Sequence, residues 1–75
     1  MPAEYMERSD HTRNLARFYQ VEIQPTLFGE WAVVSRWGRI GTYGRIQQDW
    51  FPSLPEAQTA QAHRVALKRR RGYAH

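Results

Sequence analysis

The sequence predicts an α+β domain: a small antiparallel sheet of three to five strands with one C-terminal helix packed on it. Residues 18–24 and 45–51 alternate apolar and polar side chains with a period of two, and residues 31–37 are rich in β-branched and aromatic side chains; both patterns are typical of half-buried strands. A last segment opens with helix-capping residues and ends beside a glycine, which is typical of a helix. At 75 residues the chain forms one domain at most, and a core of about 60 residues implies modest stability.

The N-terminal residues 1–16 are polar, mix charges of both signs and have no clear period. Such a segment cannot bury enough apolar surface to offset the entropy of ordering it. We therefore expect residues 1–16 to form a flexible tail and residues 17–75 to form the domain.

The first expected strand covers residues 18–24, where Tyr19, Val21 and Ile23 share one face and predict a core. Residues 25–29 connect it to a second strand at residues 30–37. There Trp37 lies on the face opposite Arg36. A third strand is expected at residues 45–51, with its Trp50 in the core or against the helix.

The helix is expected to run from Leu54 to about Arg70. Ser53 and Glu56 have the spacing of a capping box, and Gly72 suits the C-terminal cap. One stripe of this helix should face the sheet, and it consists of Leu54, Ala57, Gln61, Val65 and Lys68.

Charge is distributed unevenly along the chain, whose net charge is +4. Residues 1–35 carry a net −2 and residues 36–75 a net +6. This asymmetry favours a polyanionic partner, although solvated surface charge is the simpler alternative. The cations that end the helix also have a simple explanation, since the helix dipole favours positive charge there. These cations are Lys68, Arg69, Arg70 and Arg71.

A second cationic stretch is Arg36-Trp37-Gly38-Arg39, followed by Gly41, Gly44 and Arg45. A tryptophan held beside a glycine and flanked by arginines offers an apolar plate within fixed positive charge. Arginine matches phosphate bidentately and aromatic faces stack on bases or sugars. The alternative is that Trp37 belongs to the core and Arg39 forms a structural ion pair with Asp49 or Glu22.

Catalytic and metal-binding classes find little support in the sequence. There is no cysteine, and His11, His63 and His75 are scattered. The glycine spacing is not a dinucleotide or P-loop fingerprint. We therefore expect no enzyme activity, no metal and no cofactor. The chain also lacks an apolar run of membrane-spanning length and a signal peptide, so we expect no membrane association and a cytoplasmic location.

The Trp37-Gly38-Arg39 tripeptide with Gly41 and Gly44, the aromatic strand at residues 18–22, the helix spacing and the Gly72-Tyr73 ending resemble the WGR domain family. WGR domains occur in DNA-dependent poly(ADP-ribose) polymerases and as small bacterial proteins. The resemblance implies a stand-alone module that binds DNA at ends or breaks, as in DNA repair. It further implies that Trp37 packs on the terminal nucleotide sugar and that Arg39 holds phosphate. Gln61 departs from the family, which usually has a large apolar residue there.

The candidate DNA-binding residues combine this resemblance with charge and position. They are Trp37, Gly38, Arg39, Arg36, Arg45, Lys68, Arg69, Arg70 and Arg71. Two other functions stay open: a protein–protein interaction module without direct DNA contact, and binding of RNA or single-stranded nucleic acid.

Overall fold

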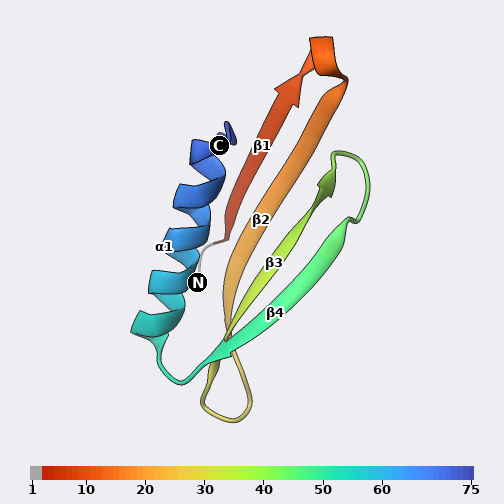
Figure 1. Cartoon of the computed structure of the whole chain (residues 1–75). Helices are drawn as coiled ribbons and strands as arrows, with labels where there is room; N and C mark the ends of the chain where they lie inside the picture. The colour runs from red at the N-terminus through yellow and green to blue at the C-terminus, as the bar shows by residue number, and fades with distance from the viewer. Residues whose placement is uncertain (1–2) are drawn as a thin grey trace.

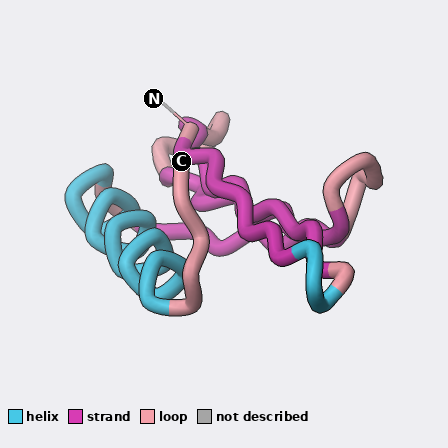
Figure 2. Tube along the Cα trace, turned by 90° about the horizontal axis from the view of Figure 1, so that it is seen from above, coloured by secondary structure: helices cyan, strands magenta, loops and turns pink. Residues whose placement is uncertain are grey.

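Four antiparallel strands and one helix make up the computed structural model, which describes residues 3–75. The strands are β1 (Glu4–Asp10), β2 (Leu15–Pro25), β3 (Trp31–Arg39) and β4 (Arg45–Phe51), and they neighbour one another in chain order. The helix α1 (Leu54–Arg70) follows and lies on one side of the strands (Figure 1; Figure 2). The predicted α+β class, with one C-terminal helix on an antiparallel sheet, is confirmed.

The expectation of a flexible tail over residues 1–16 differs from the structure. Residues Glu4–Asp10 pair along their whole length with β2, and the 3₁₀ turn His11–Arg13 joins the two strands. The strand was missed because Met6 alone supplies β1 with a fully buried apolar side chain. Its backbone bonds, which a hydropathy pattern does not report, fix it to the sheet. Residues 1–2 of the expected tail lie outside the described residues.

The core lies between α1 and the odd-numbered side chains of β2 and β3. Tyr19, Val21 and Ile23 are buried as predicted, and Val33 is opposite Ile23 in register. Ala57 and Val65 cover them from the helix, together with Met6 of β1. Trp31, Trp37 and Phe51 are partly buried against this cluster.

The stripe expected to face the sheet does so, including its polar member. The side-chain amide of Gln61 is partly buried and donates a hydrogen bond to the carbonyl oxygen of Val21 at 3.2 Å. The helix-covered face therefore includes one polar contact, from Gln61 to the backbone of β2. Ser53 caps the helix by accepting from the amide of Glu56 and donating to its carboxylate.

The opposite face of the sheet is not covered by the helix. The prediction that Trp50 is core or helix-packing is wrong, because its side chain is 57% exposed on this second face. The register explains the placement. Trp50 pairs with Ala32, and paired residues point to the same face, which for the even-numbered residues of β3 and β4 is the face away from α1. Phe51, the next residue, takes the position against the core.

Candidate nucleic-acid interface

Trp37 lies on the helix-covered face, close to the end of β3. It is in register with Tyr19 on one side and Arg45 on the other. The ring is partly buried against the core, yet it also lines two adjoining open hollows. The two interpretations of Trp37 therefore both describe part of the residue: one portion of the ring packs, and another portion stays accessible.

Glycines allow the loop after β3 to fold back against the strand behind Trp37. A Cβ at Gly38 would lie 2.8 Å from the Cα of Gly44, and a Cβ at Gly44 would lie 2.2 Å from the carbonyl oxygen of Trp37. Gly44 also has a φ of +81°, which other residues adopt at a cost. The glycine spacing after the tryptophan thus reflects a close backbone approach that holds Trp37 and Arg45 in fixed register.

The first hollow, about 440 Å³, is lined by Trp37, Arg17, Arg45 and the two glycines Gly38 and Gly44. Among the described residues, its charged lining is exclusively cationic. Arg17 is also opposite Arg39 in register, so Arg39 belongs to the same end of the same face. Arg39 donates long hydrogen bonds of 3.4 Å to the carbonyl and side-chain oxygens of Asn14 and makes no ion pair among residues 3–75.

The second hollow, about 230 Å³, runs from Trp37 toward the helix and is lined by polar groups. Lys68 is part of its wall, with its ammonium 4.8 Å from the ring centre of Tyr19 and 5.3 Å from that of Tyr73. Burial lowers the pKa of Lys68, and the nearby charges of Arg71 and Arg17 lower it further. Lys68 is therefore a partly desolvated cation close to other cations, and a bound anion would offset the repulsion between these charges.

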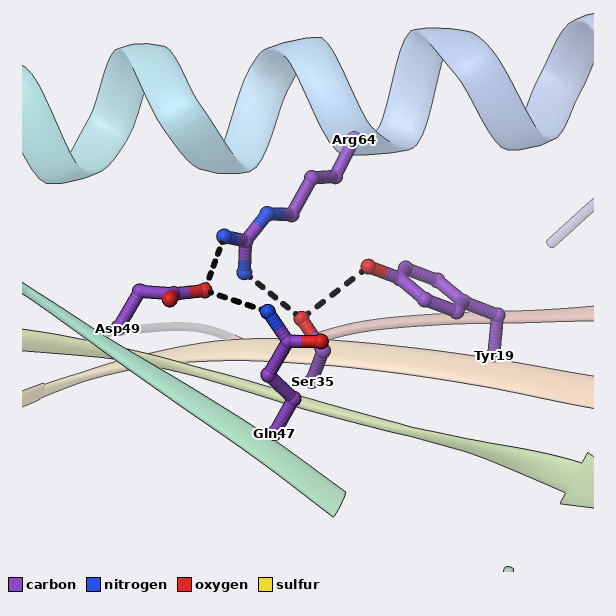
Figure 3. Close-up of polar contacts among 5 residues, drawn as sticks. All are labelled: Tyr19, Ser35, Gln47, Asp49 and Arg64. Atoms are coloured by element: carbon purple, nitrogen blue, oxygen red, sulfur yellow. Dashed lines mark hydrogen bonds and ion pairs between the residues drawn. The ribbon is translucent and has the colours of Figure 1, made fainter. Parts of the chain in front are cut away.

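A hydrogen-bonded network forms the floor of the second hollow (Figure 3). Buried Ser35 accepts hydrogen bonds from the hydroxyl of Tyr19 at 3.2 Å and from the guanidinium of Arg64 at 2.9 Å. Arg64 also forms an ion pair with Asp49, whose carboxylate accepts a further hydrogen bond from Gln47. Asp49 is thus neutralised by Arg64, and the suggested ion pair between Arg39 and Asp49 does not form.

These contacts define one surface, which we call the Trp37 groove. Its accessible aromatic residue is Trp37 and its cations come from three strands and the helix: Arg17, Arg39, Arg45, Lys68 and Arg71. Within the part of the chain that the structure describes, neither hollow is lined by an acidic side chain. Unpaired cations around an aromatic plate are able to bind phosphate and to stack on a sugar or base.

Arg36 does not belong to the Trp37 groove, contrary to its inclusion among the candidate residues. Its guanidinium lies on the other face, 4.8 Å from the ring centre of Phe18 and 5.1 Å from that of Tyr43. It donates hydrogen bonds to the carbonyl oxygen of Tyr43 at 2.7 Å and to Gln20 at 3.0 Å. The sequence predicts this placement, because consecutive residues of a strand, here Arg36 and Trp37, point to opposite faces of the sheet.

The four cations at the end of α1 separate in space. Lys68 and Arg71 lie by the groove, where they line a common hollow with Tyr19. Arg69 instead lies 3.3 Å from the imidazole of His75, and that imidazole contacts the carboxylate of Glu4 at 2.8 Å. Arg70 is exposed and lines neither hollow of the groove.

Sequence reasoning missed two contributors, Arg17 and Arg64. Arg17 enters the groove only because β2 pairs with β3 in a register that places it opposite Arg39. The alternation of residues 19–23 could have placed Arg17 on the helix-covered face, because it lies two residues before Tyr19 on the same strand. Arg64 has no such local signal, because its partner Asp49 lies 15 residues away on β4.

A comparison with known proteins bears on this geometry. The family model described as the WGR domain matches residues 3–75. An uncharacterized protein of Sinorhizobium fredii (strain NBRC 101917 / NGR234), y4dW, is 41% identical over 69 residues. The match covers 92% of this chain and 34% of that protein, so the chain spans about a third of its relative's length. No solved structure matches.

Two further findings concern membrane spans and metal ligands. No helix within residues 3–75 has the length and apolar character needed to cross a membrane. Within the same residues, no group of three or more histidine, cysteine or acidic side chains is arranged to hold a metal ion. The WGR family is a recognised family of nucleic-acid-binding modules, and the match over residues 3–75 shows that this chain belongs to the WGR domain family.

Proposed function

We propose that this chain binds DNA, at ends or breaks, through the Trp37 groove. The observation that carries the proposal is the position of Trp37: a partly accessible indole shared by two hollows that cations and polar groups of the described residues line without an acid. A duplex interior offers phosphates but no exposed base face for a single indole plate, because its bases are stacked on both sides. A strand terminus offers both, which favours ends over intact duplex.

We further propose that the domain acts by binding and carries no catalytic activity. The carboxylate of Asp49 is bonded to Arg64 and Gln47, two residues that line the second hollow. The groove is therefore arranged to attract and position an anion, with no free carboxylate or imidazole among the described side chains that line its two hollows.

The test is a panel of fluorescent oligonucleotides at fixed salt, comprising blunt, recessed and single-stranded forms and a closed circle without ends. We expect the wild type to prefer forms with a duplex end. Trp37→Phe, which retains an aromatic ring in the core but shrinks the plate, should reduce that preference. Circular dichroism and a urea titration of each variant establish that it is folded. Equal affinity for the circle and the blunt duplex would refute end binding.

Salt dependence supplies a second measurement. Four of the groove's five cations line its hollows and Arg39 lies beside Arg17, so neutralising about four phosphates predicts a slope of about −3.6 in log affinity against log salt. Arg45→Gln should make that slope shallower by about 1. A flat salt dependence would contradict a phosphate-binding groove.

A protein-interaction module is the second candidate, and a specific observation favours it. Leu27 and Phe28 at the β2–β3 turn are 98% and 87% exposed, as apolar anchors of an interface would be. Binding of a protein through these residues should be almost independent of salt and unaffected by Arg45→Gln. A double Leu27→Ser, Phe28→Ser variant that retains full DNA affinity would assign the turn to a separate role.

A further inference from the structure

The two edges of the sheet differ in how they are protected. At β1, Glu7 and Ala74 exchange two backbone hydrogen bonds, at 2.8 and 2.9 Å, so the C-terminal residues pair with the middle of that edge. At the other edge, no described strand neighbours β4 on its outer side, and no element lies beyond it in Figure 1. Between Arg45 and Phe51 the edge has none of the proline, lysine or bulge features that commonly prevent pairing.

The hydrogen-bond pattern identifies which groups of β4 point outward. Ile40 donates to Ala16 and Thr26 donates to Glu30, so the even-numbered residues of β2 and β3 bond to each other. Because antiparallel residues bond alternately to either side, the odd-numbered residues of β3 bond to those of β4. The even-numbered residues of β4 therefore direct their backbone N–H and C=O groups away from the sheet. These residues are Ile46, Gln48 and Trp50.

The same three residues place their side chains on the face that the helix leaves uncovered. Trp50 is 57% exposed and Ile46 is 50% exposed, while Gln48 between them is also exposed. Outward backbone groups and exposed apolar side chains thus coincide along one edge. A strand paired along this edge would form hydrogen bonds with the outward backbone groups and would cover the exposed apolar side chains.

We propose that the partner is a second copy of this chain, paired antiparallel through β4 with Gln48 of each copy at the two-fold axis. In this register the outward groups match, since each Ile46 is opposite the other copy's Trp50. Three residue pairs each exchange two backbone hydrogen bonds, and the two four-stranded sheets become one sheet of eight.

The helix-covered side of the same strand is compatible with this pairing. Gln47 is opposite the other copy's Asp49, and Arg45 is opposite Phe51 and diagonal to Asp49. No like charges are therefore directly opposed, and Arg45 has a carboxylate within reach across the axis. The self-complementary charge pattern favours a second copy over an unrelated strand.

The size of the interface sets its strength. The seven residues of β4 span about 23 Å, and an edge-to-edge contact of that length buries less than about 1,200 Å², which is typical of weak association. We expect a reversible dimer with a dissociation constant in the micromolar range. Trp37 and the other groove cations lie on the opposite face from Ile46 and Trp50, and Arg45 borders both the groove and the paired edge. The dimer is tested without nucleic acid, so its failure is distinguishable from a failure of DNA binding.

Sedimentation equilibrium without nucleic acid tests the dimer. The wild type should shift with concentration from its monomer mass of 8.9 kDa toward twice that value. Gln48→Pro removes an outward N–H and adds a ring at the axis without removing a bond to β3, so it should stay monomeric. Gln48→Ala is the matched control and should still dimerise. A wild type that is monomeric throughout, or a Gln48→Pro variant that dimerises equally, would overturn the proposal.

Disulfide trapping tests the register, and the chain has no native cysteine to interfere. Gln48→Cys should form a covalent dimer on mild oxidation, because directly opposite Cα atoms lie about 5.5 Å apart. Gln58→Cys, exposed on the helix, is the control and should not. Ile46→Cys should crosslink with Trp50→Cys in a mixture, but neither with itself. Equal crosslinking of the Gln48→Cys and Gln58→Cys variants, or crosslinking of Ile46→Cys with itself, would refute this register.

Discussion

Replacing Gly44 by alanine should nearly unfold the domain, because two separate costs add at this position. The first is the left-handed backbone, φ +81°, which costs an L-residue about 1–2 kcal/mol. The second is steric: the new methyl group would meet the Trp37 carbonyl oxygen at 2.2 Å and its carbon at 2.8 Å. Those neighbours are backbone atoms of a paired strand, so overpacking should cost about 1–3 kcal/mol more.

The matched control is Gly41→Ala in the same loop. Gly41 has a φ of +94°, and a Cβ there would have nothing within 4 Å, so only the backbone cost applies. The free energy of unfolding of a small domain is roughly 5 kcal/mol or little more. Gly41→Ala should therefore remain folded, whereas Gly44→Ala loses about 2–5 kcal/mol of this free energy. Urea titrations followed by tryptophan fluorescence measure both midpoints. Equal midpoints would refute the close approach behind Trp37.

Three further predictions concern charged residues. The pKa of Lys68 is lowered in the folded state, chiefly by burial. Just below pH 10.5 the unfolded chain therefore binds more protons than the folded chain, so the free energy of unfolding should rise with pH through that window. Urea midpoints from about pH 8 to about pH 10 should show this rise in the wild type and lose it in Lys68→Arg, which stays charged. Arg36→Ala should lower the urea midpoint but leave the salt slope of DNA binding unchanged, whereas Arg45→Ala should make the slope shallower and leave the midpoint unchanged. A change of slope with Arg36→Ala would contradict the placement of Arg36 outside the groove. Arg64→Met should lower stability by about 1 kcal/mol, since the Asp49 pair is partly exposed, and adding Asp49→Asn should restore part of the loss in a double-mutant cycle.

The fold was largely predictable because its signals are local. The alternation of Tyr19, Val21 and Ile23, the Ser53 cap and Gly72 after the helix each depend on a few neighbouring residues. β1 was not predictable in this way. Apart from Met6 its residues on the core face are polar, so no apolar period marks it.

The candidate site was predictable in its centre and not in its surroundings. The Trp37-Gly38-Arg39 stretch marked the centre, and strand parity separates Arg36 from it. Which residues join Trp37 depends on register and helix placement, which are long-range properties. Arg17 reaches the groove through strand pairing. Trp50 was wrongly expected in the core in place of Phe51, because the alternation within β4 alone does not show which of its two faces meets the helix.

The pairing of Glu7 with Ala74 brings the two ends of the described chain to one place. His75 lies against Glu4, so a short peptide could join them without crossing the molecule. A circular permutant joined there and opened at the exposed turn beside Phe28 keeps every strand pair and both hollows intact. Such a rearranged chain would carry its connections to other modules at the far end of the sheet, with the arginine-lined face unobstructed.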